Sequence, residues 1–534
     1  MKRLISALPL VLLLISLVAP VAGALAAEPP QVSYRIDLQH ADTGEITVTL
    51  ELEAASAPLV LEMADEYGNG LAAGLPSHIV DEKAVDASGQ TLPVVRQDNA
   101  WSIDHTGRLT FSYKMRIEDY EAGTAYLDSL AASGTPWPYF PSLDAGLAYL
   151  PGYAVFVHPR DGVYRPTLAL DLPPGWKQAL SWREQPADMD ELLNNPIFAG
   201  ELYMYEQGAL LLAIPEEASA ATGGSLAEYA GKAQVLLEKG ENLLGGLDLG
   251  EDRRLLLALL FRGEGDSLAP SIYPSSPFSD SVVVAAGPLN DPLADATIEA
   301  TTRGIVSLLL SRELILSSDA NWLEEGAAWY LQDLLPYEAG LWGASLFWDR
   351  FNLHYDTYRE ARAESAYSMA EAGAAAYESE EAAVILTSGG ASACASIDSE
   401  LRSMQPAGTD LPFFLRSLSE MSGGEDPLSN DDILSALVDL TGRDWSAFFR
   451  DYIESSREIP ASSFSSLNVV EPGASNVTSS PPDVEASTSD WIILVVAVLV
   501  VFIIPFVLEP YTMRPRKPGF LERELAKDDE DGED

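Results

Sequence analysis

The histidines of this chain limit the metal chemistry that it can perform. A hydrolytic zinc site needs two histidines four residues apart, because that spacing places both imidazoles on one helical face. The chain has five histidines, and no two of them have this spacing: His40, His78, His105, His158 and His354. The sequence therefore predicts no metal ion, no other cofactor and no catalytic residue, and a structural role for His354.

The single cysteine, Cys394, lies in the apolar stretch Ala391-Ser-Ala-Cys-Ala-Ser396. One cysteine excludes an intrachain disulfide. A free cysteine in apolar surroundings usually packs as a small hydrophobic side chain. We therefore predict a buried thiol here in preference to a reactive nucleophile.

The segment Trp322-Leu-Glu-Glu-Gly-Ala-Ala-Trp-Tyr330 resembles the W-L-x-E-G-x-A-x-Y segment of gluzincin metallopeptidases. In that superfamily the glutamate before the glycine is the third zinc ligand, on the helix after the HExxH helix. The resemblance places Glu325 at this position.

Three further segments resemble the glycyl-aminopeptidase-like branch of the same superfamily. They are Gly162–Trp182, which contains Leu-Pro-Pro-Gly-Trp, then Leu192-Leu-Asn-Asn-Pro-Ile-Phe-Ala-Gly200, and Leu440-Thr-Gly-Arg-Asp-Trp-Ser-Ala-Phe-Phe449 with Ile459-Pro460. Together the matches span roughly residues 30–460, in the order that the family has. The resemblance implies a peptidase-like scaffold and, by itself, no turnover.

The residues at the expected metal position depart from the family pattern. The usual spacing puts the second histidine 19 residues before Glu325, so HExxH would occupy residues 302–306. The chain has Thr-Arg-Gly-Ile-Val there, so both histidines are missing and the general base is replaced by Arg303. We predict an ion pair between Arg303 and Glu325 at the former metal position. The alternative is that Glu325 caps a helix or faces solvent.

The resemblance also suggests a peptide-binding strand. It would correspond to Val282, Val283, Val284, Ala285 and Ala286, because an exposed strand can pair with an extended peptide through its backbone. Burial in the core explains the same apolar run. Tyr355, Tyr358 and Tyr377 could stand near the former cleft, but aromatic spacing in a helical region usually reflects core packing.

Hydrophobic periodicity predicts a multi-domain α+β fold. Short runs of period two read as antiparallel strands of a β-sandwich-like domain, followed by a thermolysin-like α/β unit, a helical domain and one transmembrane helix. The predicted boundaries are 1–26 (signal peptide), 28–215 (β-rich), 218–340 (α/β), 341–458 (helical), 459–490 (disordered stalk), 491–508 (transmembrane helix) and 509–534 (cytoplasmic tail). Gly389-Gly390, Pro406 and Gly423-Gly424 are predicted to interrupt the helices.

Both ends of the chain carry targeting signals. Met1-Lys-Arg3 and the apolar run to Ala22 indicate a signal peptide cleaved after Ala26. The uncharged segment 491–508 is followed by Arg514, Arg516 and Lys517, which predicts a single-pass cell-membrane protein with its large domain outside. Asn476-Val-Thr478 in the stalk is a glycosylation sequon.

The formal charge of −49 excludes nucleic acid as a partner. A strongly acidic, lysine-poor surface suits a salty exterior, where counterions screen self-repulsion. We therefore hypothesise the envelope of a salt-tolerant, archaeal cell.

Three functions remain open from the sequence. The first is a catalytically inactive, peptidase-like protein that binds a peptide or protein at the cell envelope. The second is an active aminopeptidase-like hydrolase with a non-standard site. The third is a structural surface protein.

Overall fold

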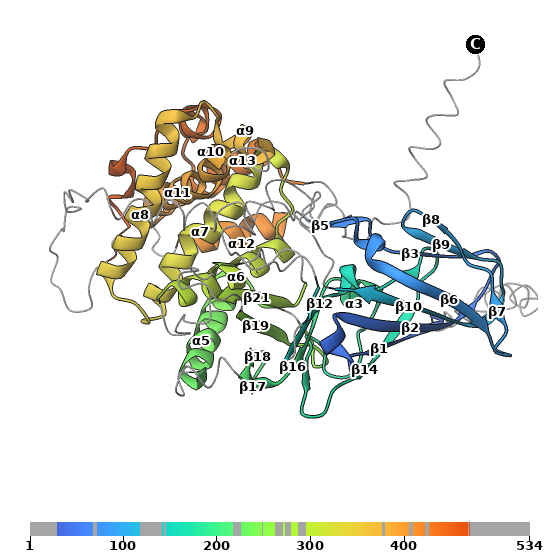
Figure 1. The fold of residues 1–534 in the computed structure, drawn as a ribbon. Helices are drawn as coiled ribbons and strands as arrows, with labels where there is room; N and C mark the ends of the chain where they lie inside the picture. Colours follow the sequence, from blue (N-terminus) through green and yellow to red (C-terminus); the bar gives the residue numbers. More distant parts are fainter. Residues whose placement is uncertain are drawn as a thin grey trace, which may run out of the picture.

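The computed structural model describes residues 29–67, 72–117, 141–143, 146–216, 226–247, 249–261, 271–272, 279–286, 295–375, 380–404, 409–421, 427–467 and 469. Figure 1 shows a β-rich part and a helical part, joined by a smaller sheet.

The β-rich part contains a six-stranded sheet in the order β14-β1-β2-β10-β6-β7. Its strands are β1 (Gln31–Asp37), β2 (Glu45–Ala54), β6 (Ile79–Asp86), β7 (Thr91–Leu92), β10 (Gly107–Arg116) and β14 (Arg165–Asp171). In β2 every second residue from Ile46 to Ala54 is buried, as period-two patterning predicts. The sheet is not purely antiparallel, because β1 and β14 pair in parallel.

A second sheet, β13-β3-β9-β8, lies against the first. Its strands are β3 (Leu59–Glu62), β8 (Val95–Gln97), β9 (Ala100–Ile103) and β13 (His158–Pro159). Trp101 of β9 is completely buried and its ring lies 6.2 Å from that of Phe111 in β10. This aromatic contact joins the two sheets, and the N-terminal part is β-rich, as predicted.

A third sheet, β11-β12-β16-β15, connects the β-rich part to the rest of the molecule. Its strands are β11 (Ser142–Leu143), β12 (Leu147–Pro151), β15 (Lys177–Ala179) and β16 (Pro196–Gly200). β12 and β16 are buried along their whole length. A Cβ on Gly200 would lie 2.3 Å from the carbonyl oxygen of Gly146, so this position of the Leu192–Gly200 segment requires glycine.

The central sheet has the order β17-β18-β19-β21-β20. Its strands are β17 (Leu202–Gln207), β18 (Leu210–Pro215), β19 (Leu255–Phe261), β20 (Ser271–Ile272) and β21 (Ser281–Ala286). In β19, Leu255, Leu257 and Leu259 pack into the helical core, whereas Leu256 and Leu260 pack into the β core. Burial on both faces explains why the strand is a continuous apolar run.

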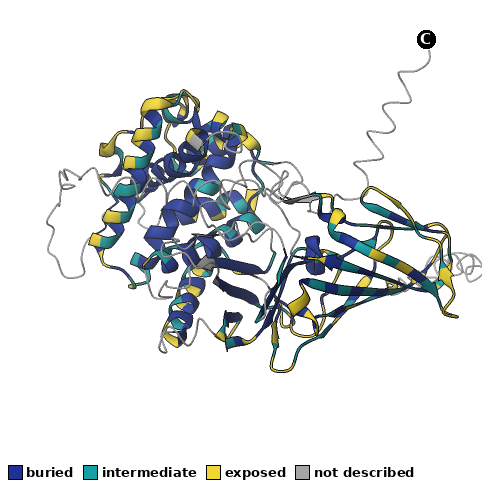
Figure 2. Cartoon of the chain, in the orientation of Figure 1, coloured by how far each residue is buried: buried dark blue, intermediate teal, exposed yellow. Residues whose placement is uncertain are grey.

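The helical part packs on the other side of this sheet (Figure 1). Its helices are α5 (Leu226–Leu244), α6 (Asp295–Glu313), α7 (Asn321–Glu338), α8 (Ala344–Glu364), α9 (Met369–Ala375), α10 (Glu380–Val384), α11 (Gly390–Arg402), α12 (Leu411–Met421), α13 (Asn430–Thr441) and α14 (Ser446–Phe448). Figure 2 shows that α7 is buried over most of its length.

Gly389-Gly390 does not interrupt a helix, which corrects the sequence prediction. A π-helical turn, Ile385–Gly389, runs directly into α11. A Cβ on Gly326 of α7 would lie 2.2 Å from the carbonyl carbon of Gly390, so the two backbones cross in direct contact. Glycine is required here by close helix packing and not by a turn.

The predicted stalk begins too early. Phe464 is buried, and its ring lies 5.0 Å from Phe351 and 5.1 Å from Tyr355. Trp348 donates a hydrogen bond from Nε1 to the carbonyl oxygen of Val469. The folded region therefore extends past residue 459, because aromatic side chains of α8 bind the segment after it.

No helix in the part of the chain that the structure describes is both long and apolar enough to cross a bilayer. This finding contradicts the predicted localisation as a single-pass membrane protein, and we withdraw that prediction. The segment 491–508, the signal peptide, Asn476 and the tail all lie outside the described residues.

Candidate functional site

Residues 302–306, where the sequence resemblance places the HExxH segment, lie on α6, which packs against α7. Thr302 is completely buried and its hydroxyl donates to the carbonyl oxygen of Ile298 at 2.7 Å. Val306 is also completely buried and carries no ligand atom. The side chains at the two histidine positions therefore do not fit a zinc ion, and no hydrolytic step can be derived through one.

Arg303 stands where the general base of the family would stand. It is 4% exposed, and its guanidinium carbon lies 3.8 Å from the ring centroid of Trp329. Burial lowers the pKa of Arg303 to about 10, against the opposing effects of Glu299, Glu325 and Asp333. Arg303 therefore remains a cation at neutral pH, held by an aromatic face and by nearby carboxylates.

Glu325 is partly exposed on α7. Its charge raises the pKa of Arg303, although less than Glu299 does. The two side chains are thus within electrostatic reach of each other. The Arg303–Glu325 ion pair itself stays a prediction.

Beside Arg303 the structure brings together three residues that the sequence does not connect. Glu299 of α6, Asp333 of α7 and His354 of α8 each direct one ligand atom into a space where these atoms all lie within 4.8 Å of one another. His354 Nε2 lies 3.4 Å from Asp333 Oδ2 and 3.6 Å from Glu299 Oε1. We call these three residues the Glu299–Asp333–His354 cluster.

Two side chains of α7, Gln332 and Trp329, contact the residues of the cluster. Gln332 Nε2 lies 3.0 Å from His354 Nε2 and donates to Glu299 Oε1 at 3.3 Å. The ring of Trp329 makes an edge contact with the His354 imidazole at 5.1 Å. The imidazole plane is therefore fixed between α7 and α8.

The two carboxyl groups respond differently to this environment. Burial, followed by the charge of Glu299, holds the pKa of Asp333 well above its usual range, and Arg350 and Arg303 oppose this only in part. Burial also acts to raise the pKa of Glu299, but its contacts with His354, Arg350 and Arg303 leave that pKa lowered. One group is thus stabilised as the acid and the other as the carboxylate.

Sequence reasoning missed this cluster. It assigned His354 a structural role and did not single out Glu299 or Asp333. One signal was available, because Gln332 and Asp333 interrupt the otherwise apolar run from Trp329 to Leu335. An acid within such a run must be paired, protonated or bound to a ligand.

The strand that was predicted to bind peptide is β21. It pairs with β19 on one side and, at Val284 and Ala285, with β20 on the other. Ser281, Val282, Val283 and Val284 are at most 1% exposed. The strand is therefore an interior strand in this structure, and peptide binding through its backbone stays a prediction that requires β20 to be displaced.

The tyrosines near the former cleft hold the chain after residue 457. Tyr355 donates to the carbonyl oxygen of Ile459 at 2.9 Å, and the hydroxyl of Tyr358 accepts from the Ile459 N–H at 3.2 Å. These contacts are structural, and Tyr377 lies outside the described residues. Cys394 is a buried free thiol, as predicted.

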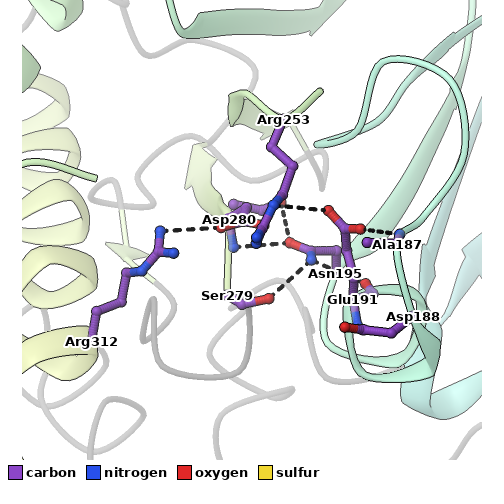
Figure 3. A network of polar contacts seen from close by, with 9 residues as sticks. Ala187, Asp188, Glu191, Asn195, Arg253, Ser279, Asp280 and Arg312 are labelled. Atoms are coloured by element: carbon purple, nitrogen blue, oxygen red, sulfur yellow. Dashed lines mark hydrogen bonds and ion pairs between the residues drawn. The ribbon is translucent and has the colours of Figure 1, made fainter. Parts of the chain in front are cut away.

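A second buried network, shown in Figure 3, joins the β-rich part to the central sheet. Asp280 has no exposed surface and accepts hydrogen bonds from Arg253 at 3.3 Å and from Arg312 at 3.2 Å. Its backbone N–H donates to Asn195 Oδ1 at 3.0 Å. Both oxygens of this buried carboxylate are therefore paired with cations.

Asn195 connects this network to the β-rich part. Its Nδ2 donates to the carbonyl oxygen of Glu191 at 3.1 Å and to Ser279 Oγ at 3.0 Å, while its Oδ1 also accepts from Ser281 Oγ at 2.9 Å. Glu191 lies on the short helix α3 (Met189–Leu193). The family-like segment Leu192–Gly200 thus has a structural role at the junction of the sheets.

Comparison with known proteins agrees with this architecture. Residues 33–201 match the Peptidase M61 N-terminal domain. The structure is similar to an aminopeptidase N family protein from Idiomarina loihiensis, with a TM-score of 0.65, 16% identity, and coverage of 80% of this chain and 77% of that chain. No curated protein sequence matches the chain.

Two more distant structures show lower similarity. An M1 zinc metallopeptidase from Deinococcus radiodurans has a TM-score of 0.45 at 16% identity, covering 81% of this chain and 95% of that one. Native yeast LTA4 hydrolase has a TM-score of 0.43 at 9% identity, covering 81% and 68%. At 16% identity the similarity to the Idiomarina loihiensis protein concerns the fold alone, and residues 33–201 are similar to the Peptidase M61 N-terminal domain.

Proposed function

We propose that this chain does not hydrolyse peptide bonds at the gluzincin zinc position and acts instead by binding a peptide or protein. One observation carries the proposal. A hydrogen-bonded threonine, a buried arginine cation and a valine stand where the family mechanism needs two imidazoles and a carboxylate base. At residues 302–306 a zinc ion would find neither imidazole nor a carboxylate base, and the Arg303 cation would weaken its binding further.

The architecture around the position supports a binding role. α6 and α7 remain packed together, and the central sheet joins them to the β-rich part. A scaffold that keeps its shape without its catalytic groups can still recognise an extended chain. Binding of a peptide along β21 would require β20, and the residues that bury positions 281–284, to move away.

A purely structural role is the second candidate, and the burial of Ser281–Val284 favours it. In that case the sheet edge stays closed and binds nothing. The two candidate functions make different predictions for hydrogen exchange. A binding role predicts that an added peptide slows exchange in β20 and β21, whereas a structural role predicts no change.

The absence of hydrolysis is tested with the purified chain and a panel of aminoacyl fluorogenic substrates, with and without chelator. Because the chain carries a charge of −49, the assays use about 1 M NaCl, where the screening length is about 3 Å. We expect no chelator-sensitive hydrolysis. Chelator-sensitive turnover by the wild-type chain would overturn the proposal.

A matched gain-of-function variant makes this test sharper. The triple change Thr302→His, Arg303→Glu and Val306→His recreates HExxH upstream of Glu325. We expect it to bind zinc in a manner that depends on Glu325, with circular dichroism as the check that it folds. The wild-type chain is expected to lack Glu325-dependent zinc binding.

Binding is tested separately by hydrogen exchange in the presence of a pool of unstructured peptides. Added protection of β20 and β21 would support recognition. Unchanged exchange at every peptide concentration would leave the structural role as the better account.

A further inference from the structure

We propose that Glu299, Asp333 and His354 bind a divalent transition-metal ion, at a site separate from the gluzincin zinc position. The inference goes beyond the proposed function, because none of the three residues belongs to the HExxH and glutamate positions. Glu299 lies one helical turn before Arg303 on α6. Asp333 lies eight residues after Glu325 on α7, which is about 12 Å along the helix axis.

The spacing of the three ligand atoms matches a metal site. Ligands of a tetrahedral zinc ion, with bonds of about 2.0–2.2 Å, lie about 3.3–3.6 Å from one another. His354 Nε2 lies 3.4 Å from Asp333 Oδ2 and 3.6 Å from Glu299 Oε1. Two edges of the coordination polyhedron are therefore already at the required length.

The same distances argue against a proton as the partner of His354. Hydrogen bonds between an imidazolium and a carboxylate are about 2.7–2.9 Å long. Both carboxylate oxygens lie well beyond this range from Nε2. A proton on Nε2 would therefore make only a long hydrogen bond to either carboxylate, whereas a metal ion would contact both at normal bond lengths.

The state of Asp333 is the second observation that points to a ligand. Asp333 has no exposed surface, and neither of its carboxylate oxygens has a hydrogen-bond partner among the described residues. Burying a carboxyl group without a hydrogen-bond partner is energetically unfavourable. A cation between Asp333, Glu299 and His354 would offset this cost.

Gln332 offers a fourth ligand. Its Oε1 is buried without a hydrogen-bond partner among the described residues, while its Nε2 lies 3.0 Å from His354 Nε2. Rotation of the terminal amide by about 180° exchanges these two atoms and points the oxygen at the ligand space. The donor set is then two carboxylates, one imidazole and one amide oxygen.

The charges around the cluster allow a divalent ion. Glu299, Asp333 and Glu325 supply three negative charges when ionised, and Arg303 and Arg350 supply two positive ones. With a neutral His354 the group carries −1, so a divalent ion changes it to +1. The two arginines are expected to weaken metal affinity without excluding it.

The donor set indicates which ions are suitable. Imidazole with carboxylates suits Zn²⁺ and Mn²⁺, whereas Ca²⁺ prefers six to eight oxygen ligands. We therefore choose Zn²⁺ and Mn²⁺ as probes and Ca²⁺ as the comparison ion.

The test uses the full chain, purified without an affinity tag and stripped with chelator. Isothermal titration calorimetry with each probe measures affinity and stoichiometry, and the absorption spectrum of the Co²⁺-loaded chain reports the ligand field. We expect one ion per chain, bound more tightly than Ca²⁺. The variants Asp333→Asn and His354→Gln are expected to lose at least 10-fold in affinity and to change the Co²⁺ spectrum.

Glu325→Gln is the matched control, since it removes a carboxylate from the gluzincin position on the same helix. It is expected to leave Zn²⁺ affinity within about threefold of wild type. Asp333→Asn keeps the shape of the side chain, so thermal unfolding of the metal-free variant checks that it folds.

Each outcome separates this inference from the proposed function. Loss of Zn²⁺ affinity in Asp333→Asn but not in Glu325→Gln supports the metal site and leaves the proposed function intact. Loss of Zn²⁺ affinity in Glu325→Gln alone overturns both the metal site and the proposed function. Failure of the stripped chain to bind Zn²⁺ or Mn²⁺ overturns the site alone, and leaves His354 as a buried imidazole flanked by two acids.

Discussion

Two of the buried acidic networks among the described residues, those of Asp280 and Asp333, differ in how completely their carboxylates are satisfied. Asp280 is fully buried, and each of its carboxylate oxygens contacts an arginine. Asp333 is equally buried, but its oxygens have no hydrogen-bond partner among the described residues. The first arrangement is what a structural junction between sheets requires, whereas the second is typical of a site that awaits a ligand.

The comparison predicts the largest loss of stability at Asp280. Asp280→Ala removes the carboxylate that pairs with Arg312 and, together with Glu191, with Arg253, so it weakens the charge balance of a partly buried junction. We expect the free energy of unfolding to fall by about 3–5 kcal/mol, measured by urea denaturation. Glu51→Ala, at the exposed pair with Arg108, is the control and is expected to cost less than about 1 kcal/mol. Similar losses in both variants would contradict the structural role of Asp280.

Asn195 tests whether the junction depends on hydrogen bonds as well as charge. Asn195→Ala leaves the Asp280 N–H and the hydroxyls of Ser279 and Ser281 without their partner. At about 1 kcal/mol for each hydrogen bond, we expect a loss of about 2–3 kcal/mol. A limited-proteolysis assay should also show faster cleavage between the β-rich part and the central sheet. An unchanged cleavage rate would show that the junction is held by packing alone.

Asp432 shows what a satisfied but exposed carboxylate contributes. It forms a capping box with Ser429 at the start of α13, and these hydrogen bonds lower its pKa. Asp432→Ala is expected to cost about 1 kcal/mol at neutral pH. Because the folded pKa is lowered, this contribution is present above about pH 4 and is lost as the pH falls through the lowered pKa. Chemical denaturation of the wild type and of Asp432→Ala between pH 2 and 7 would measure this pH dependence. A difference in the free energy of unfolding that does not change with pH would exclude the capping role.

The smallest effect is expected at the unsatisfied network. In the metal-free chain Asp333→Asn removes no hydrogen bond of the carboxylate, so the free energy of unfolding should stay within about 1 kcal/mol of wild type. The loss of stability in Asp333→Asn should therefore be much smaller than the loss in Asp280→Ala. A loss of several kcal/mol in the metal-free variant would show that Asp333 has a structural role instead.

Much of the fold was predictable because its signals are local. Period-two alternation predicts β2 and β10, and a continuous apolar run predicts β19 and β21. Helical periodicity predicts helices over about residues 294–316 and 320–335, within a few residues of α6 and α7. The glycine pair at 389–390 was misinterpreted, because the same residue serves both a turn and a close helix crossing. Only the contact with Gly326 distinguishes the two.

In the candidate site, too, some features follow from the sequence and others only from tertiary contacts. The mismatch at residues 302–306 follows from residue identity alone, since threonine and valine cannot replace two imidazoles whatever the packing. By contrast, Glu299, Asp333 and His354 come from three helices and meet because α6, α7 and α8 pack side by side.

The sequence by itself thus determined the strand and helix pattern, the strong negative charge and the absence of the HExxH residues. These are properties of neighbouring residues and of composition. Tertiary structure alone decided which buried acids are paired with arginine, which helices cross through glycine, and where an imidazole meets two carboxylates. The physical reason is that burial and partnership depend on contacts between residues far apart in the chain, and local periodicity carries no information about which distant side chain will fill a given space.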